Sequence, residues 1–251
     1  MTPQITFIIV NWNRWDLVAK QLPILTHFKS GQVIVVDNFS DTDLPQHLKT
    51  KFDQVIWLLN KQNLGFARAC NLGAQKAQSE WLFFLNPDVM FDRDEQILAL
   101  LRYAQANQLD AVSPQPEKNQ VDLYAKNLPT VYNLVQEFTP LGRFLPQQNG
   151  VKSLTGGLLL IKKSVLQKIG GWDGDFFVWF EDCDLTYRLL EGGYKVGWSP
   201  EVIHHIGAGS VLKLEMKERK RLYFGSMQKY ADKHFGWLGQ LAVKIISLIN
   251  T

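Results

Sequence analysis

The sequence contains little cysteine and no long apolar run. Its two cysteines, Cys70 and Cys183, cannot form a disulfide framework, which is typical of a protein from a reducing compartment. No stretch of about 18 apolar residues is present, so we expect no membrane-spanning helix. The first residues lack a basic segment followed by a long apolar core. We therefore expect no signal peptide and a cytoplasmic protein.

The chain also lacks a large net charge and a dinucleotide-binding motif. The formal net charge of +3 on 251 residues predicts no general affinity for nucleic acid. A Gly-x-Gly-x-x-Gly motif would be expected after the first strand of a dinucleotide-dependent dehydrogenase, but the chain has Asn11-Trp12-Asn13-Arg14 there. Hydrophobic content of 46% and charged content of 20% are typical of a globular enzyme or binding protein.

Buried-strand patterns alternate with helical patterns along the first half of the chain. Strands are predicted at 4–10, 32–37, 55–59, 81–86 and 111–114, and helices at 15–28, 44–52, 66–78 and 93–107. This alternation predicts an α/β protein with a parallel sheet covered by helices on both faces. Residues 115–152 show no steady period and could form a lid or an acceptor-binding region. Further strands are predicted at 158–162, 195–198 and 202–205, and helices at 180–191, 214–234 and 237–249.

Acidic residues follow two of these buried strands. Asp37 closes the second strand, and Asn86-Pro87-Asp88 follows the apolar run WLFFL. The carboxyl ends of parallel strands form the edge where open α/β sheets bind ligands. A carboxylate there can accept a hydrogen bond from a pyrimidine N–H or hold Mg²⁺ or Mn²⁺ under a diphosphate. The alternative is ordinary turn chemistry, but the occurrence of both acids at strand ends favours a nucleotide site.

A second acidic cluster, Glu181-Asp182-Cys183-Asp184, begins a predicted helix after an aromatic run. Acids in a first turn also favour the helix dipole, which is the alternative interpretation. The aromatic run predicts burial of at least one carboxylate and hence a raised pKa, which suits a general base. Glu181 and Asp184 share a helical face, so Asp182 is predicted to face the cleft instead.

Seven segments then occur in a fixed order: VNWNRWDL (10–17), VVDNFSD (35–41), NLGFARACNLG (63–73), FLNPDV (84–89), GGLLLIKKSVLQKIGGWD (156–173), FEDCDLTYRLLEGGYKVGWSP (180–200) and HHIGAGS (204–210). Together they resemble the inverting glycosyltransferase family 2, in its rhamnosyltransferase-like branch. The resemblance implies a GT-A fold, with a Rossmann-like, mostly parallel sheet flanked by helices and followed by C-terminal helices. It implies one domain over 1–251, comprising a nucleotide-sugar-binding half (1–114), an acceptor and catalytic half (115–210) and the C-terminal helices (211–251).

The resemblance also implies roles for individual residues. Asp182 matches the catalytic base, Asp88 the metal-binding acid, and His205 a histidine near the metal and diphosphate. His204 remains an alternative to His205, although its distance to Ser210 fits the family pattern less well. The candidate substrate-binding residues are Asn11, Asn13, Asp37, Asn63, Gly65, Asn71, Asn86 and Glu181, with Asp37 contacting the nucleotide base. The chain departs from the family at Asn86, where many members carry Asp, and at Cys70, where many carry Arg.

The implied reaction moves L-rhamnose from dTDP-L-rhamnose to a glycan or polyprenyl-diphosphate-linked acceptor in cell-surface polysaccharide synthesis, with Mg²⁺ or Mn²⁺ as cofactor. The alternatives are a UDP-hexose-dependent glycosyltransferase and a sugar-nucleotide-binding protein without turnover.

The last predicted helix carries an apolar stripe next to a basic segment. Its members are Leu238, Leu241, Ala242, Ile245 and Ile249. One interpretation is that the stripe packs on the catalytic domain. The other is that it lies in the surface of an anionic membrane, giving a peripheral contact on the inner face.

Overall fold

The computed structural model describes residues 4–28, 31–115, 127–148, 150–206 and 214–250, with the side chain of His205 outside the description. The strands are β1 (Ile5–Asn11), β2 (Gly31–Asp37), β3 (Ile56–Leu59), β4 (Trp81–Leu85), β5 (Val89–Met90), β6 (Ala111–Gln115), β7 (Leu158–Lys162), β8 (Val196–Val202) and β9 (His204–His205). The helices are α1 (Trp15–His27), α2 (Gln46–Lys51), α3 (Phe66–Lys76), α4 (Asp94–Ala106), α6 (Val131–Phe138), α7 (Lys163–Lys168), α8 (Glu181–Glu191), α9 (Met216–His234), α10 (Trp237–Asn250) and the 3₁₀ helix η2 (Pro140–Phe144).

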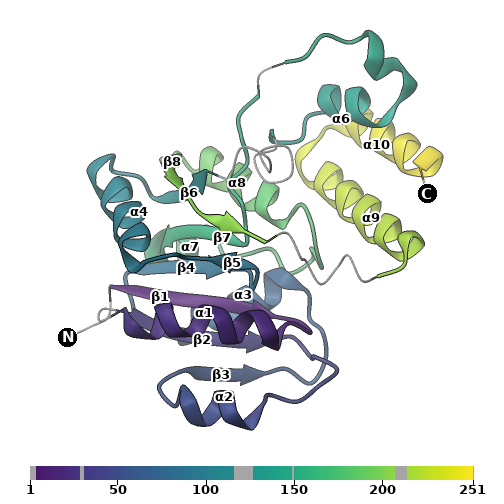
Figure 1. Ribbon diagram of the computed structural model, residues 1–251. Helices are drawn as coiled ribbons and strands as arrows, with labels where there is room; N and C mark the ends of the chain where they lie inside the picture. The colour runs from purple at the N-terminus through teal and green to yellow at the C-terminus, as the bar shows by residue number, and fades with distance from the viewer. Residues whose placement is uncertain (1–3, 29–30, 116–126, 149, 207–213, 251) are drawn as a thin grey trace.

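Seven strands form one mostly parallel sheet in the order β3-β2-β1-β4-β7-β6-β8 (Figure 1). The predicted mostly parallel α/β architecture is therefore confirmed. β7 runs antiparallel to both β4 and β6. The chain leaves β6 at the carboxyl edge of the sheet and passes through α6 and η2 before it returns to the same edge. Re-entering there, β7 must run in the opposite direction.

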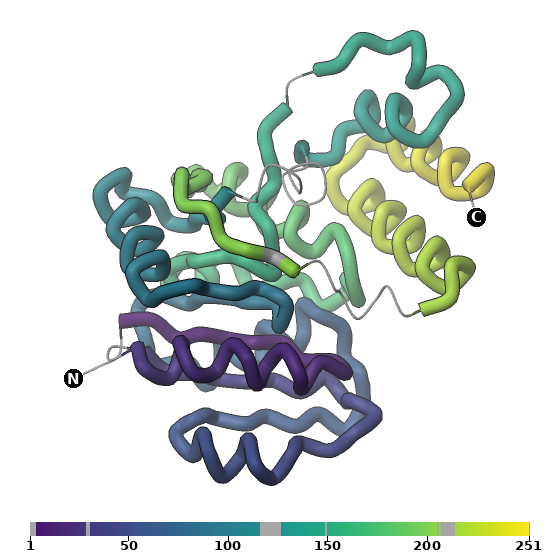
Figure 2. Tube along the Cα trace, in the orientation of Figure 1, coloured from purple at the N-terminus to yellow at the C-terminus, as the bar shows by residue number. Residues whose placement is uncertain are grey.

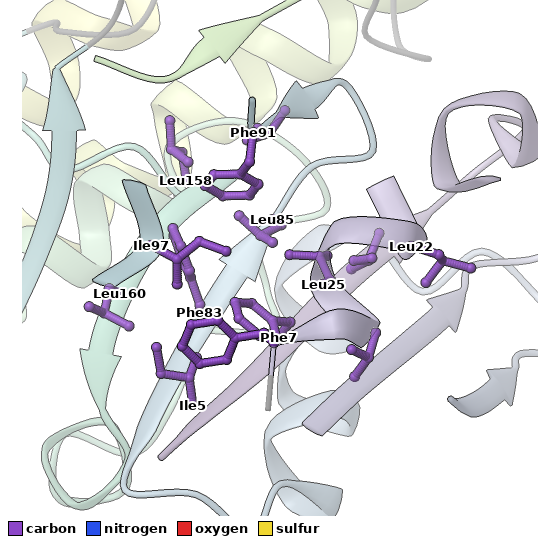
Figure 3. Packing of buried hydrophobic residues seen from close by; sticks show 14 of the residues in the cluster. Ile5, Phe7, Leu22, Leu25, Phe83, Leu85, Phe91, Ile97, Leu158 and Leu160 are labelled. Atoms are coloured by element: carbon purple, nitrogen blue, oxygen red, sulfur yellow. The ribbon is translucent and has the colours of Figure 1, made fainter. Parts of the chain in front are cut away.

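The sheet is buried on both faces because its strands are apolar at successive positions. In β1, Phe7 and Ile9 pack into the layer with α1 and α4, whereas Ile8 and Val10 pack into the layer with α3, α7 and α8. Figure 3 shows the first of these layers, where Phe7 and Phe83 lie at its centre. This rigid core holds the carboxyl ends of β1, β2 and β4 in fixed positions.

A third apolar cluster lies beyond the sheet and joins α6, α9 and α10 to the segment before α8. Its buried members are Leu134, Phe176, Phe180, Phe224, Met227, Tyr230, Ala231, Val243 and Ile246. Figure 2 shows these three helices grouped together at one end of the molecule. Helix α6 lies within residues 115–152, where the sequence shows no steady hydrophobic period and no helix was predicted. Its eight residues are capped by Thr130 and Asn133 in a reciprocal box, in which Asn stands at a position where Glu or Gln is more usual.

The C-terminal stripe does not pack on the catalytic domain. Helix α10 instead buries Gly239, Val243 and Ile246, which face α6 and α9. Leu238 and Leu241 on the predicted stripe remain at least half exposed, and so do Ile245 and Ile249. Among the described residues, no helix is both long enough and apolar enough to cross a bilayer.

Candidate active site

The carboxyl edge of the sheet brings Asn11 and Asp37 together. β1 and β2 are parallel and pair Asn11 directly with Asp37. The buried Asn11 Nδ2 donates a hydrogen bond to Asp37 Oδ1 at 2.8 Å. Ser40 also binds this carboxylate, because its backbone N–H donates to Asp37 Oδ2 at 3.0 Å. Asp37 is thus fixed at the sheet edge, with its carboxylate oriented by neighbours on both sides.

Three further asparagines join the loops that follow β1, β2 and β3. Asn13, at φ 59°, exchanges hydrogen bonds with Asp41 through both polar atoms of its amide. Asn38 donates to Asn63 Oδ1 at 2.7 Å, and Asn63 Oδ1 also accepts from the Gly65 N–H at 2.9 Å. The candidate residues Asn13 and Asn63 therefore organise the loops around Asp37.

Gly65 begins α3 where the backbone of another segment comes very close. It has φ 82°, and an added Cβ would lie 2.6 Å from the carbonyl oxygen of Phe177. The next residue, Phe66, donates its N–H to that same oxygen at 2.8 Å. Asn71, one turn further along α3, uses both polar atoms of its amide to hold the backbone of Trp172. The start of α3 therefore fixes the segment that leads into the acidic cluster.

Asp88 lies in the turn between β4 and β5 and is 4% exposed. The buried Gln21 on α1 supports this turn, because its Nε2 donates to the carbonyl oxygens of Asn86 and Val89. β5 pairs with β9, so Val89 lies opposite His205, and the Ile206 N–H donates to the Asp88 carbonyl at 2.9 Å. The backbone of His205 is thereby held next to Asp88, although the two residues are far apart in the sequence.

Asp182 lies in the first turn of α8 and is partly exposed, whereas Glu181 and Asp184 are buried. As helical spacing predicted, Glu181 and Asp184 therefore lie on the buried face of α8, and Asp182 lies on another face. The two preceding residues, Trp179 and Phe180, both adopt the left-handed backbone region, with φ 62° and 65°. Such conformations cost on the order of 1 kcal/mol each in residues other than glycine. Burial of Phe180 in the third apolar cluster offsets that cost and fixes the direction in which α8 begins.

Two consecutive glycines connect Asp182 to the β4–β5 turn. The Gly156 N–H donates to Asp182 Oδ2 at 3.4 Å, and the Gly157 carbonyl accepts from the Asn86 N–H at 2.7 Å. A Cβ on Gly157 would come within 2.2 Å of the Asn86 side-chain amide. A larger residue would displace the Asn86 side chain, so glycine suits this close approach, which brings the turn with Asp88 and the start of α8 to the same place.

The two neighbouring acids, Glu181 and Asp182, both have raised pKa values. Burial, together with the charge of Asp182, raises the pKa of Glu181 to about 8. Desolvation also raises the pKa of Asp182, while hydrogen bonds from Cys183 and Gly156 oppose that shift. Asp182 is thus a better proton acceptor than an ordinary aspartate, and Glu181 is mostly protonated at neutral pH.

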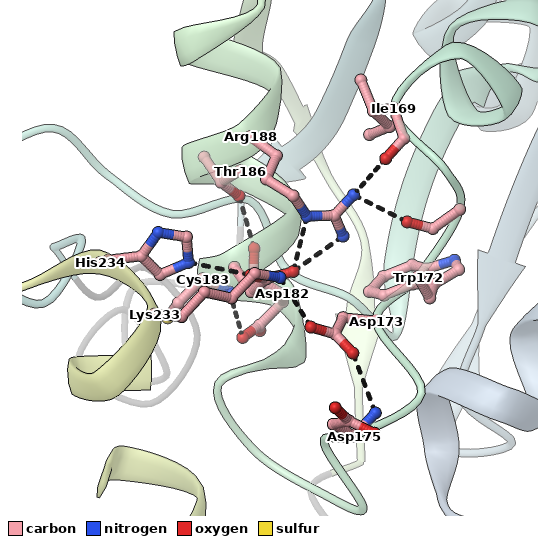
Figure 4. A network of polar contacts seen from close by, with 12 residues as sticks. Ile169, Trp172, Asp173, Asp175, Asp182, Cys183, Thr186, Arg188, Lys233 and His234 are labelled. Carbon is pink, nitrogen blue, oxygen red and sulfur yellow. Dashed lines mark hydrogen bonds and ion pairs between the residues drawn. The ribbon is translucent and has the colours of Figure 1, made fainter. Parts of the chain in front are cut away.

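Asp184 anchors the other side of α8 to α9. Figure 4 shows its partners Arg188, Lys233 and His234 close together. Its fully buried carboxylate pairs with Arg188 at 2.7 Å, Lys233 at 2.6 Å and His234 at 2.9 Å. Burial opposes ionisation, but these hydrogen bonds and charges lower the pKa of Asp184 to about 2. Lys233 also pairs with Asp173 at 2.6 Å, so α9 holds both α8 and the segment before it.

The side chains near Asp88 could hold a divalent cation only if a bound substrate supplied some of the coordinating oxygens. Among the side chains that the structure describes, no three His, Cys, Asp or Glu residues form a metal-binding group. Asp88 supplies a buried carboxylate beside the backbone of His205. Such a site matches cations that take one or two protein ligands and complete their shell with diphosphate oxygens and water.

A family model described as glycosyl transferase family 2 matches residues 6–170, which is more than half of the chain. The chain belongs to this family. A second model, glycosyl transferase family group 2, matches residues 129–250. The match to family 2 covers β1 to α7, including Asp37 and Asp88, and ends before Asp182.

Two relatives and one solved structure are similar to this glycosyltransferase over different shares of their length. N-acetylglucosaminyl-diphospho-decaprenol L-rhamnosyltransferase of Mycobacterium tuberculosis is 26% identical over 239 residues, covering 82% of this chain and 76% of the relative. Poly-beta-1,6-N-acetyl-D-glucosamine synthase of Staphylococcus aureus is 25% identical, and the match covers 78% of this chain but only 48% of the synthase. A mannosyltransferase from Pyrobaculum calidifontis, solved with GDP-Man and Mn²⁺, superposes with a TM-score of 0.66 at 17% identity over 100% of this chain and 71% of the neighbour.

Several residues of this family 2 glycosyltransferase site were not among the candidates from the sequence. Gln21, Asn38, Ser40, Gly156 and Gly157 hold the candidate residues in place through hydrogen bonds. Asn38 and Ser40 lie in the quoted segment 35–41 and the two glycines in the segment 156–173, whereas Gln21 lies in none of the quoted segments. Cys70 stands where many family members carry Arg. It is fully buried in α3, so its thiol lies in the core.

Replacing Glu181 with Gln should change how the stability of this glycosyltransferase depends on pH. The unfolded carboxyl loses its proton near pH 4.5, whereas the folded one keeps it up to about pH 8. Between these values the ionised unfolded state is favoured, so Glu181 destabilises the fold increasingly as the pH rises. Each pKa unit corresponds to about 1.4 kcal/mol. The neutral amide removes this effect, and the Tm advantage of Glu181→Gln over wild type should widen from pH 5 to pH 8.

The control for this prediction is Glu191→Gln, which changes an exposed acid at the other end of α8. Its Tm difference from wild type should not vary over the same pH range. A Tm difference for Glu181→Gln that is also constant with pH would show that Glu181 is not buried as a neutral acid.

Proposed function

We propose that this family 2 glycosyltransferase transfers a sugar with inversion, with Asp182 as the general base. The observation that carries the proposal is the junction at Gly156 and Gly157. One glycine binds the Asp182 carboxylate, and the other binds the turn that contains Asp88. A carboxylate with a raised pKa therefore lies beside the carboxyl edge of the sheet, the edge at which open α/β sheets bind ligands, and this supports a base next to a nucleotide site.

The proposed reaction is a single in-line displacement. Asp182 accepts the proton of an acceptor hydroxyl, and the hydroxyl oxygen attacks the anomeric carbon from the face opposite the diphosphate. The bond between the anomeric carbon and the diphosphate oxygen breaks, and its electron pair leaves with the nucleoside diphosphate. One carboxylate suffices, because attack from the opposite face inverts the centre without a covalent intermediate.

In this proposal Asp88 and His205 hold a divalent cation, Mg²⁺ or Mn²⁺. When bound, the cation supplies positive charge next to the diphosphate, where negative charge grows during the reaction. The neighbour from Pyrobaculum calidifontis was solved with Mn²⁺, which supports the choice of a divalent cation. Asn86 adds no carboxylate to the site, so the remaining coordination positions go to water and the diphosphate.

We propose dTDP-L-rhamnose as the donor and a polyprenyl-diphosphate-linked glycan as the acceptor, in cell-surface polysaccharide synthesis. The relative from Mycobacterium tuberculosis, named as an L-rhamnosyltransferase acting on N-acetylglucosaminyl-diphospho-decaprenol, supports both assignments. Residues 1–114 would hold the donor and residues 115–210 the acceptor and the base. The acceptor's lipid implies that the protein meets it through a peripheral contact with a membrane.

A panel of nucleotide sugars tests the donor. Release of the nucleoside diphosphate is measured with dTDP-L-rhamnose, UDP-hexoses and GDP-mannose, each with and without a GlcNAc-diphosphate-lipid acceptor. We expect acceptor-dependent release with dTDP-L-rhamnose. Turnover with a UDP-hexose alone would replace the donor assignment with the UDP-hexose alternative. Binding of a nucleotide sugar without release in any mixture would favour a sugar-nucleotide-binding protein.

Asp37→Ala should weaken binding of the bare nucleoside diphosphate, whether or not a sugar is attached. We propose that Asp37 accepts a hydrogen bond from the base, and a hydrogen bond to a charged group contributes about 1.5–3 kcal/mol, or at least a tenfold change in Kd. Calorimetry with dTDP and UDP measures this change. The control is Asp43→Ala, which removes an exposed acid further along the same loop and should bind the nucleotide like wild type. An unchanged Kd in Asp37→Ala would assign Asp37 a purely structural role.

A further inference from the structure

Helix α10 exposes a continuous apolar face at the end of the molecule away from the sheet. Its exposed members are Trp237, Leu238, Leu241, Ile245, Leu248 and Ile249, with exposed fractions from 50% to 72%. The opposite, narrow face of α10 is filled by α6 and α9. A soluble protein rarely leaves so many large apolar side chains together in water, so this face marks an interaction site.

A second segment adds exposed apolar side chains at the same end. The 3₁₀ helix η2 follows α6 directly and exposes Leu141 by 63% and Phe144 by 72%. The Asn250 side chain at the end of α10 donates to the Phe138 carbonyl at 3.1 Å, which places η2 beside the last turn of α10. Figure 1 shows α6 and α10 side by side there, with the chain after α6 curling next to them. Two distant parts of the sequence thus expose apolar side chains at the same end of the molecule.

Most charges around this surface are positive, although Glu137 near the end of α6 is an exposed acid. α10 contains no acidic residue and one exposed lysine, Lys244, and η2 contains Arg143. Lys220 on α9 reaches the Asn250 carbonyl at 2.9 Å, so the basic first turns of α9 border the end of α10. Helix α9 carries six lysines and arginines and two acids, but Arg221 is paired with Glu218, and Lys233 with Asp173 and Asp184. An anionic surface complements this arrangement, whereas a second copy of the chain would bring the same positive charges together across a two-fold axis.

We propose that the exposed faces of α10 and η2 dock on an anionic lipid bilayer. The apolar side chains enter the boundary between headgroups and acyl chains, and the exposed Lys220 on α9, Lys244 on α10 and Arg143 on η2 contact anionic headgroups. This inference deepens the proposed function, because it rests on an acceptor that is anchored in a membrane.

The docking surface is connected rigidly to the proposed base. Val243 and Ile246 on the buried side of α10 pack in the same cluster as Phe180, which immediately precedes Glu181 and Asp182. Lys233 on α9 binds Asp184 on α8. Docking would therefore hold Asp182 at a fixed height above the bilayer, where the diphosphate end of a lipid-linked acceptor is found.

Vesicle sedimentation at low salt tests the proposal with the full chain. Wild type should sediment with phosphatidylglycerol-containing vesicles and stay in the supernatant with pure phosphatidylcholine. Leu248→Asp should bind the anionic vesicles at least tenfold more weakly. The matched control Leu59→Asp changes an exposed leucine on β3, far from this surface, and should bind like wild type. Equal melting curves for both variants and wild type establish that folding is unchanged.

Three outcomes would overturn the docking proposal. Wild type could remain in the supernatant with both kinds of vesicle, Leu248→Asp could bind as tightly as Leu59→Asp, or sedimentation velocity could reveal a dimer that Leu248→Asp dissociates. A separate measurement distinguishes failure of the proposed function. Leu248→Asp should transfer sugar normally to a short-chain, water-soluble acceptor and lose transfer to the same headgroup embedded in vesicles. If wild type transfers to neither acceptor, the proposed function fails whatever the sedimentation result.

Discussion

Asp182→Asn is expected to reduce sugar transfer at least a hundredfold while leaving the affinity for nucleoside diphosphate nearly unchanged. The substitution preserves the size of the side chain and the hydrogen bond from Cys183, but the amide cannot accept a proton at neutral pH. A positioned general base typically contributes about 10²–10⁴ in rate, which sets the expected loss. The rate is measured as sugar incorporated into acceptor, and the affinity by calorimetry with the nucleotide.

Two variants make this result specific. Glu181→Gln changes the adjacent carboxyl group and should retain most activity at pH 7, because Glu181 is already mostly protonated there. Asp53→Asn changes an exposed acid after α2 and should behave like wild type. Full activity in Asp182→Asn would remove the proposed base, and an equal loss in Glu181→Gln would mean that the two acids act as one unit.

Asp88→Ala should weaken both cation and donor binding, by about 100-fold in donor affinity. Groups that only support a metal ligand typically contribute about 10–100-fold, so loss of the carboxylate itself should cost at least as much. Binding of the donor is measured by calorimetry at several Mn²⁺ concentrations, and turnover of wild type is measured with and without EDTA. Raising the Mn²⁺ concentration should restore part of the donor affinity of Asp88→Ala.

The matched control is Asp92→Ala, an exposed acid that lies just after β5. It should bind donor and cation like wild type. Wild-type activity that is indifferent to EDTA would exclude the cation from the mechanism, and basic side chains would then have to stabilise the leaving diphosphate.

The strands and the positions of the acids could be predicted because both follow from local pattern. The apolar run of β4 must be buried on both faces, and a polar residue directly after it can only lie at the sheet edge. Asp37 and Asp88 are therefore found where the sequence predicted them. Helical spacing also predicted that Asp182 lies away from the buried face of α8, because Glu181 and Asp184 share that face.

The residues that hold this site together could not be predicted, because they act across long distances in the sequence. Nothing local distinguishes Gln21 from any other helical glutamine, yet its side chain supports the turn that carries Asp88. The approach of Gly157 to Asn86 likewise depends on β7 entering the sheet antiparallel to β4. Helical spacing in α10 showed that an apolar stripe exists, but only its packing partners decide which side is buried.

The anomeric configuration of the product tests the central claim most directly. Wild type is incubated with dTDP-L-rhamnose and a GlcNAc-diphosphate-lipid acceptor, and the new linkage is analysed by NMR through the coupling of the anomeric carbon to its proton. A single displacement with Asp182 as base predicts a linkage whose configuration is opposite to that of the donor. A product with the configuration of the donor would contradict it, because retention requires either a second displacement or attack from the face of the leaving group.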